Sequence, residues 1–298
     1  MSQSPLSSQL DAERTAILEH AAASVLAVES QRVRQSAFVW RGGLLVTAAE
    51  PLEGADSVRV LQDGNSNEAE VLAADLRTDI AVIRFPGAPA PALAAAAAAP
   101  RVGQTIVALG RVAQDLSASW GSVQLSGGPW STRRGGTLSR RLVLELRLAH
   151  GAEGGPVLDL DGRAVAMAVR GPANQVLGIP IDAVEAAVSD VAAHGHIPRG
   201  YLGVRDVPLA LGLQARHRLN AGHAVLIVAD VAQASPALAA GLDIGDLLLA
   251  IDGDAVQTPD RLLGRIHGKR PGETLRLTRR RGTTVDEVNV TLGSRPPA

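Results

Sequence analysis

The sequence Gly151-Ala152-Glu153-Gly154-Gly155-Pro156 decides how the rest of this 298-residue chain is read. Two stretches precede it, Val46-Thr47-Ala48-Ala49-Glu50 and Asp75-Leu76-Arg77-Thr78-Asp79-Ile80-Ala81-Val82-Ile83. Both contain short apolar runs, and further runs of this kind, separated by turn residues, recur from Ser24 to Phe85. Short strands with frequent turns are typical of a β-barrel.

The three stretches resemble, in chain order, the motifs of the HtrA (Deg) family of trypsin-like serine proteases. Val46 to Glu50 resembles the strand end "V-T-x-x-H", with Glu50 at the position of the histidine base. Asp75 to Ile83 is similar to the segment whose second aspartate, here Asp79, orients that histidine. Gly151 to Pro156 resembles the nucleophile loop, with Glu153 in place of the serine. The resemblance implies a bacterial double-barrel fold with a degenerate triad.

The two replaced side chains matter because of the chemistry they supply. A serine hydroxyl attacks a carbonyl only when a neutral imidazole takes its proton, and an aspartate holds that imidazole in place. Glu153 has no hydroxyl to deprotonate, and Glu50 has no imidazole. We therefore expect no intact catalytic group at Glu50, Asp79 and Glu153. The resemblance still implies a vestigial oxyanion hole at Gly151 and Glu153.

An active enzyme is the alternative interpretation. A carboxylate can act as a nucleophile, so a hydrolase using Glu50, Asp79 and Glu153 is conceivable, but attack on a peptide would form an anhydride, a less favourable intermediate than an ester. Glu50 could act as a base only with a raised pKa. His150, beside the loop, is the one histidine expected near the cleft, and we interpret it as an ordinary loop residue because the family's base comes from the first barrel.

Three converging carboxylates raise a second question, since like charges at short range cannot all ionise without penalty. Glu153 could turn toward the N–H groups of the former oxyanion hole, Glu50 toward solvent or an arginine, one group could hold a proton, or Ca²⁺ or Mg²⁺ could bind. We favour solvent or an arginine and place metal binding last, because these cations usually require about six or more oxygen ligands. We expect no metal and no cofactor.

Composition describes an ordinary globular protein, with 46% hydrophobic and 20% charged residues. Two domains are the default expectation at this length. The net charge of -1 gives no bulk electrostatic attraction for nucleic acid. The chain has no cysteine, which excludes disulfides and thiolate metal sites.

The first residues bear on localisation. Residues 1–23 are expected to form a helical segment, because Ser8 and Asp11 open a pattern that continues through Ile17 and Leu18. They contain neither the apolar core of a signal peptide nor a membrane span. We expect a cytoplasmic protein if Met1 is the true start, with the periplasm as the alternative because most HtrA-like proteins are exported or tethered to a membrane.

Residues 24–197 are predicted to form the trypsin-like domain. Its first barrel extends to Phe85, and a connector rich in proline and alanine follows over residues 86–99. The second barrel runs from Gly103 to about Ile181, and residues 182–194 have helical spacing. The residues expected to pack this helix are Val184, Ala187, Val188 and Val191.

Residues 198–298 resemble a PDZ domain. Arg199-Gly200-Tyr201-Leu202-Gly203-Val204 resembles its carboxylate-binding loop, and Thr258 followed by Pro259 predicts the start of a helix. The resemblance implies that a peptide with a free C-terminus binds here by strand addition. The expected peptide-binding residues are Tyr201, Leu202, Gly203, Val204, Leu262 and Ile266.

The sequence thus predicts a mainly β protein, a chymotrypsin-like double β-barrel followed by a PDZ domain. We expect a pseudoprotease of protein quality control that acts as a peptide-binding scaffold or regulator, and not an enzyme; the alternative is an active HtrA-type serine endopeptidase. Expected partners are C-terminal peptides or unfolded proteins. A homotrimer, or a hetero-oligomer with an active relative, is implied by resemblance, without nucleic acid or a membrane span.

Overall fold

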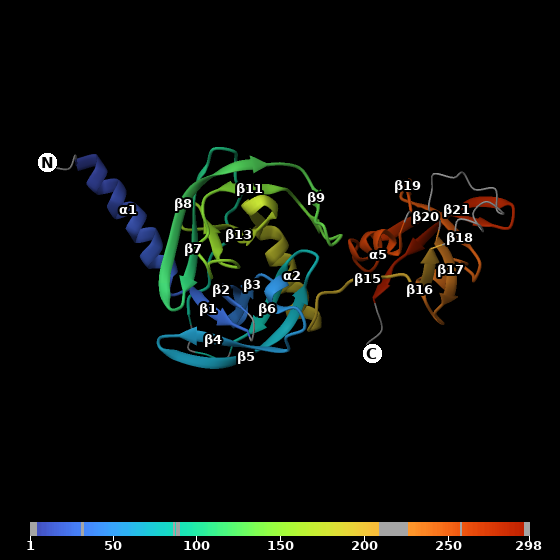
Figure 1. Ribbon diagram of the computed structural model, residues 1–298, viewed down its shortest axis with the longest axis horizontal. Coiled ribbons are helices and arrows are strands. Elements are labelled where there is room, and N and C mark those ends of the chain that lie inside the picture. Colours follow the sequence, from blue (N-terminus) through green and yellow to red (C-terminus); the bar gives the residue numbers. More distant parts are fainter. Residues whose placement is uncertain are drawn as a thin grey trace. The chain divides into compact units, whose positions relative to one another are not determined.

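The computed structural model describes residues 5–30, 33–85, 87, 90–208, 226–256 and 258–294. It divides into two compact units, Met1–Thr132 with Thr137–Ile197 and Arg133–Gly136 with Pro198–Ala298. Both units are mainly β, as the sequence predicts (Figure 1). Two of the histidines, His217 and His223, lie outside the described residues.

The first unit opens with a helix and a closed six-stranded barrel, as expected for residues 24–85. The barrel strands run in the order β1-β2-β3-β6-β5-β4. Their interior is lined by aliphatic side chains such as Leu45, Val60 and Ile83, all almost fully buried. The elements are α1 (Pro5–Ala22), β1 (Val25–Glu29), β2 (Arg34–Val39), η1 (Arg41–Gly43), β3 (Leu44–Thr47), η2 (Glu50–Leu52), β4 (Ser57–Gln62), β5 (Asn65–Asp75) and β6 (Ile80–Arg84).

A second closed barrel follows, with strand order β11-β14-β13-β12-β7-β8. The predicted helix is α2 (Ile181–His194); it ends at Gly195 in the left-handed conformation and buries the four predicted packing residues. The strands are β7 (Thr105–Val112), β8 (Asp115–Ser126), β9 (Trp130–Ser131), β10 (Thr137–Leu138), β11 (Leu142–Glu145), β12 (Pro156–Leu158), β13 (Ala164–Arg170) and β14 (Val176–Pro180), with η3 (Pro172–Asn174) before β14.

The alanine-rich connector is extended in the structure. Ala164 N donates to Ala94 O at 2.8 Å and Ala96 N donates to Ala164 O at 2.9 Å, so the connector pairs in parallel with the start of β13. Small side chains permit this close approach. The connector therefore runs alongside the start of β13, outside the closed barrel.

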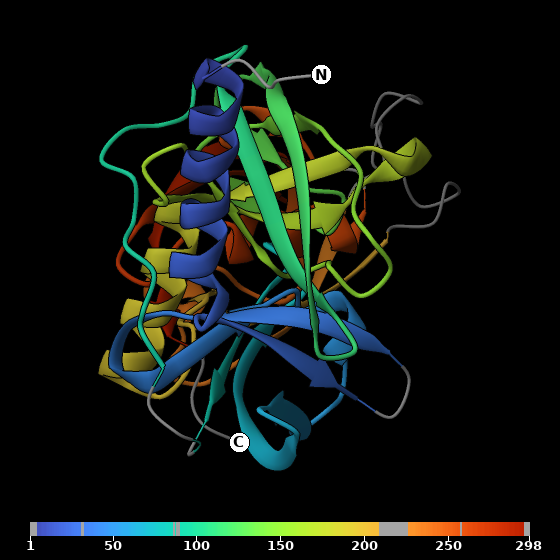
Figure 2. The same ribbon diagram turned by 90° about the vertical axis from the view of Figure 1, so that its left-hand side faces the viewer.

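Helix α1 begins at Pro5, three residues before the predicted start at Ser8. Proline suits the first turn of a helix because its missing N–H needs no partner there. The helix lies beside the β7–β8 hairpin (Figure 2), where the guanidinium of Arg14 sits 5.0 Å from the centre of the Trp120 ring. Across the described residues, no helix combines the length and apolarity needed to cross a membrane.

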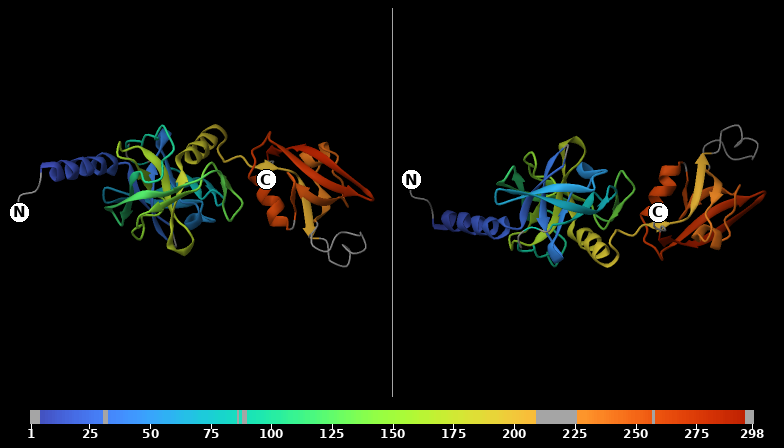
Figure 3. Two further views of the ribbon diagram at one scale, coloured as in Figure 1. Left: turned by 90° about the horizontal axis from the view of Figure 1, so that it is seen from above. Right: turned by 90° about the horizontal axis from the view of Figure 1, so that it is seen from below.

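Among its described residues, the second unit contains an antiparallel sheet and two short helices (Figure 3). Its sheet order is β16-β17-β18-β20-β21, with β19 paired to β18. Thr258 caps α5 as predicted, accepting a hydrogen bond from Arg261 N at 3.3 Å. The elements are β15 (Gly200–Tyr201), β16 (Val204–Pro208), β17 (Leu226–Val231), α4 (Pro236–Ala239), β18 (Leu247–Ile251), β19 (Asp254–Ala255), α5 (Pro259–His267), β20 (Thr274–Arg281), β21 (Thr284–Thr291) and β22 (Gly293–Ser294).

Candidate functional sites

Asp79 joins the turn between β5 and β6 to the end of β3. Its backbone adopts a positive φ of 58°, and its Oδ1 accepts hydrogen bonds from Ala49 N at 2.9 Å and Glu50 N at 2.8 Å. Burial raises the pKa of Asp79 from 3.8 to about 6, aided by the negative charges of Glu153 and Glu50, while the two backbone hydrogen bonds oppose the rise. The structure thus brings Glu50, Asp79 and Glu153 within electrostatic reach of one another.

Glu50 is the first residue of η2 and is followed by Pro51. Its backbone is fixed by Asp79, whereas its side chain is exposed. Solvent therefore screens the Glu50 carboxylate, which is one of the forms of relief expected from the sequence.

Buried Ser36 on β2 holds the loop that carries Glu153. Its Oγ donates to Gly151 O at 2.7 Å and accepts from Arg111 N at 2.7 Å, while its backbone N donates to Glu153 O at 2.8 Å. A buried hydroxyl that serves as both donor and acceptor fixes two backbone segments at once. The first barrel thereby positions a loop that belongs to the second.

Gly154 allows this loop to lie against the first barrel. Its φ is 80°, and a Cβ added there would come within 2.4 Å of Thr47 Oγ1 and 2.5 Å of Ser36 O. Only glycine fits both the left-handed backbone and this close approach.

The side chain of Glu153 turns toward the end of β13. Its Oε1 accepts from Arg170 N at 2.8 Å, and its Oε2 lies 3.7 Å from Arg170 Nε. The Arg170 Nη2 in turn donates to Leu148 O at 3.3 Å and Ala149 O at 3.2 Å. The Glu153 carboxylate thus faces the backbone N–H group and the guanidinium of Arg170, and not the oxyanion-hole N–H groups that the sequence left open as one alternative.

The N–H groups of Gly151 and Glu153 are the donors that the sequence predicts for a vestigial oxyanion hole. Gly151 has a φ of 90°, and Ala152 N donates to Ala149 O at 3.1 Å, which closes a tight turn. Within the described part of the chain, neither Gly151 N–H nor Glu153 N–H donates to a protein acceptor. His150, beside them, is exposed.

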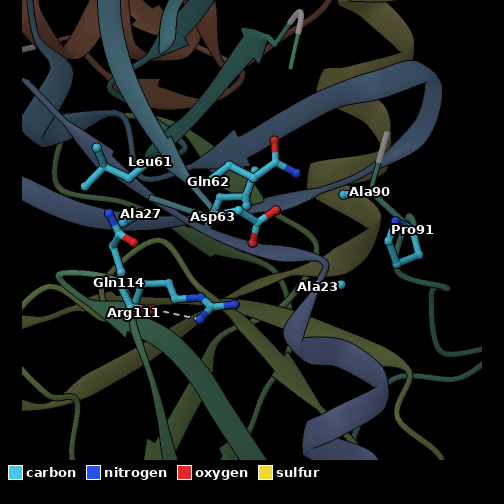
Figure 4. A pocket seen from close by; sticks show the side chains of 10 residues that line it. Ala23, Ala27, Leu61, Gln62, Asp63, Ala90, Pro91, Arg111 and Gln114 are labelled. Atoms are coloured by element: carbon cyan, nitrogen blue, oxygen red, sulfur yellow. Dashed lines mark hydrogen bonds between the residues drawn. The ribbon is translucent and has the colours of Figure 1, made fainter. Parts of the chain in front are cut away.

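Neither the three carboxylates nor any other group of three or more His, Asp or Glu among the described residues is arranged to hold a metal ion. A hollow of about 260 Å³ lies elsewhere in the first unit (Figure 4). Arg111 lines it, but its guanidinium already donates to Val25 O at 2.9 Å, Gln114 O at 2.8 Å and Ala22 O at 2.7 Å. This arginine therefore supports the barrel wall and leaves little capacity for a ligand.

The predicted carboxylate loop of the second unit leads into β16. Gly203 has a φ of 83°, and a Cβ there would lie 2.3 Å from Ser235 Cβ. Ala237 N donates to Leu202 O at 2.9 Å and Ala232 N donates to Gly203 O at 2.8 Å, so the loop's carbonyl groups face the protein. Over the described ranges, Leu202 N–H and Gly203 N–H donate to no protein acceptor, and β16 is an edge strand of the sheet.

Helix α5 packs against β15 and β16. The predicted groove residues Leu262 and Ile266 are only 1% and 4% exposed and belong to the core of the unit, whereas Leu263 is 46% exposed. Arg265 bonds Asp254 on β19. Leu263 and Arg265 are two positions apart and therefore lie on nearly opposite sides of the helix, so Leu263 projects away from the flank of α5 that faces Asp254.

Two residues of the first site were not identified in the sequence. Arg170 ends the apolar run of β13, where a charged residue is an ordinary strand end. Ser36 is 0% exposed and lies in a buried strand pattern that carries no chemical signal. The contacts of both depend on chain segments far away in the sequence.

Comparisons with known proteins agree with this architecture. Residues 35–167 match the trypsin-like peptidase domain and residues 200–292 match the PDZ domain. A protein of Brucella suis named "Probable periplasmic serine endoprotease DegP-like" is 28% identical over 272 residues, covering 85% of this chain and 51% of that protein. One of the same name from Halomonas elongata is 29% identical over 286 residues, covering 90% and 58%.

The solved structure "HtrA-type protease AlgW with decapeptide" superimposes with a TM-score of 0.64 at 22% identity, covering 95% of this chain and 99% of that one. At this identity the likeness supports the fold alone. The chain spans about half the length of the curated relatives it matches.

Proposed function

We propose that this chain, a homologue of DegP-like serine endoproteases of the HtrA family with a trypsin-like peptidase domain and a PDZ domain, binds peptides but does not hydrolyse them. The main observation behind the proposal is the identity and the contact of Glu153. A carboxylate stands where the loop should present a nucleophile, and it is hydrogen-bonded to Arg170 N at 2.8 Å.

The remaining groups do not compensate for the missing hydroxyl. Asp79, with a pKa of about 6, is half-buried and its Oδ1 is occupied by two backbone N–H groups. Glu50 is exposed and has no hydroxyl to activate. An oxyanion hole without a triad supports a residual acceleration of about 10³ to 10⁴ over water, against roughly 10⁶ or more for a typical enzyme.

Peptide binding is assigned to the PDZ domain. The N–H groups of Leu202 and Gly203, which have no acceptor within the described ranges, suit a terminal carboxylate, and the open edge of β16 suits a peptide main chain, as in strand addition. The similar structure is named "HtrA-type protease AlgW with decapeptide", which supports a peptide as the ligand class. The partners we propose are C-terminal peptides and unfolded proteins, with a role as scaffold or regulator in protein quality control.

The competing function is serine endopeptidase activity, because the relatives are named serine endoproteases. Incubation of the purified full chain with casein and with a serine-directed phosphonate probe separates the two. We expect neither cleavage nor labelling. Robust cleavage or a labelled adduct would contradict the pseudoprotease proposal and indicate an active serine endopeptidase.

Assembly and compartment belong to the same proposal. A complex with an active relative would place the PDZ domain beside a working protease, whereas a homotrimer would contain only copies of this chain; light scattering and a pull-down from the native cell distinguish these assemblies. We propose two compartments, the cytoplasm and the periplasm, the second of which appears in the names of the relatives. Cell fractionation with antibodies decides between them.

A further inference from the structure

The nucleophile-position loop and strand β13 are joined by a short backbone ladder. Gly154 N donates to Ala168 O at 2.8 Å, and Ala168 N donates to Gly155 O at 2.9 Å. In a strand, residues two apart direct their N–H and C=O groups to the same side. Arg170 N–H therefore points toward the same edge as Ala168 N–H, one step beyond the ladder.

At that step a side chain replaces the backbone partner. Glu153 Oε1 accepts from Arg170 N–H at 2.8 Å, at the position where the carbonyl of an added strand would bind. A carboxylate forms a stronger hydrogen bond with an N–H group than a neutral carbonyl does. An incoming peptide would have to displace it.

The contact is reciprocal. Arg170 Nη2 donates to Leu148 O and Ala149 O, so each residue's side chain holds the backbone of the other's segment. The ion pair itself adds little, because Arg170 Nε is 3.7 Å from Glu153 Oε2 and the side chains are 41% and 22% exposed. The hydrogen bonds to the backbone carry the contact.

We propose that Glu153 and Arg170 form an autoinhibitory clasp that closes the edge of β13 at Arg170 and excludes an extended peptide from that edge. The residue that removes the nucleophile thereby also blocks the surface beside it. This clasp goes beyond the proposed function, since a barrel without a nucleophile could still bind peptides along an open edge.

Hydrogen exchange in the full-length protein tests the clasp directly. In the Glu153→Ala variant, the peptide spanning residues 168–171 should exchange about tenfold faster or more, because the Arg170 amide loses its acceptor. The Glu153→Gln variant keeps an amide oxygen at the same place and should stay near the parent. Equal exchange in parent and Glu153→Ala would overturn the clasp.

Photo-crosslinking tests the closed edge. The probe is an extended, C-terminally amidated peptide with a photoreactive phenylalanine, and amidation prevents capture by the PDZ loop. We expect labelling of residues 168–171 in Glu153→Ala and in neither the parent nor Glu153→Gln. Labelling of the parent at these residues would show that the edge of β13 is open and would contradict the clasp.

The readouts remain interpretable if a variant folds poorly or if the proposed function fails. Glu153→Gln and thermal melting identify a folding defect in Glu153→Ala, and Arg170→Ala gives a second route to the same opening by releasing Leu148 O and Ala149 O. It should speed exchange of the peptide spanning residues 147–152, and unchanged exchange there contradicts a reciprocal clasp. Casein cleavage by the parent would refute the pseudoprotease proposal alone, because the clasp is judged by exchange and labelling.

Discussion

The two candidate sites use the same backbone device with opposite outcomes. Gly151 and Glu153 in the barrel, and Leu202 and Gly203 in the PDZ domain, present N–H groups without a protein acceptor among the described residues. In the PDZ domain these donors are the main part of the expected binding site. In a serine protease such donors are only one part of a reaction that also requires particular side chains.

This difference teaches that recognition by backbone groups tolerates sequence change far better than side-chain chemistry does. Any residue except proline supplies an N–H group, provided the loop keeps its conformation, whereas only serine, cysteine or threonine supplies a hydroxyl or thiol nucleophile of this kind. The same chain can therefore lose hydrolysis and keep peptide capture.

The largest expected effect comes from rebuilding the triad. Glu153→Ser alone should show no turnover of casein above the parent, because the base is still absent. Glu50→His with Glu153→Ser should at best produce weak proteolysis, out of the roughly 10⁶-fold that an intact triad contributes in a serine protease. Turnover by Glu153→Ser alone would contradict the view that catalysis in the barrel needs two particular side chains, since the serine would then suffice.

The next effect concerns the PDZ loop. A peptide with a free apolar C-terminus should bind with micromolar affinity, about -8 kcal/mol or weaker, and its amidated form should not bind measurably by calorimetry. Gly203→Ala should abolish binding as well, because the added Cβ lies 2.3 Å from Ser235 Cβ.

The control for that variant is Gly241→Ala, which has a comparable φ of 76° but no atom within 4 Å of the added Cβ. It should lose some stability and keep peptide binding. Equal binding of the acid and amide peptides would mean that the loop does not capture a carboxylate.

A third prediction concerns how each loop is held. Ser36→Ala leaves Gly151 O and Arg111 N without their buried partner and should lower the free energy of unfolding by about 1 to 3 kcal/mol, measured in urea. The PDZ loop, held through backbone bonds at Leu202 O and Gly203 O, should keep its peptide affinity in this variant. A weakened affinity would show that the two loops are not independent.

The last expected effect is a pH dependence at Asp79. Its folded pKa of about 6 lies above the ordinary 3.8, so its protonated form adds stability that is complete below pH 3.8 and is lost as the pH rises through about 6. Asp79→Asn keeps an oxygen for the two backbone N–H groups but carries no charge. It should flatten stability between about pH 4 and 7 and gain about 1 to 3 kcal/mol at pH 7.

Glu153→Gln is the companion measurement, because it removes one of the charges that raise the pKa of Asp79. Its unfolding midpoint should depend less on pH than the parent's over the same range. An unchanged profile in both variants would mean that the carboxylates do not interact.

The sequence predicted the architecture well because its signals are local. Apolar runs with turn residues predicted the barrels, and Thr258 with Pro259 predicted the start of α5. Helix phase was harder: Leu262 and Ile266 were assigned to the groove, yet they face the core, and a shift of one residue turns the side chain by about 100° to Leu263.

The side-chain partners of the first site could not be predicted. Glu153 meets Arg170 only because the loop and β13 share a particular register, which depends on the bonds between Gly154, Gly155 and Ala168. Ser36 likewise reads as a plain strand residue until its distant partners are known. Such contacts belong to tertiary structure, and no local pattern encodes them.

The position of Ser36 also has a consequence for folding order. Its partners Arg111 and Gly151 lie 75 and 115 residues further along the chain. During synthesis the hydroxyl and the backbone N–H of Ser36 therefore bond to water in place of their native partners until most of the second barrel has been made. Contacts of such long range slow folding, so the first barrel is expected to acquire native protection from hydrogen exchange around Ser36 only when the second barrel closes.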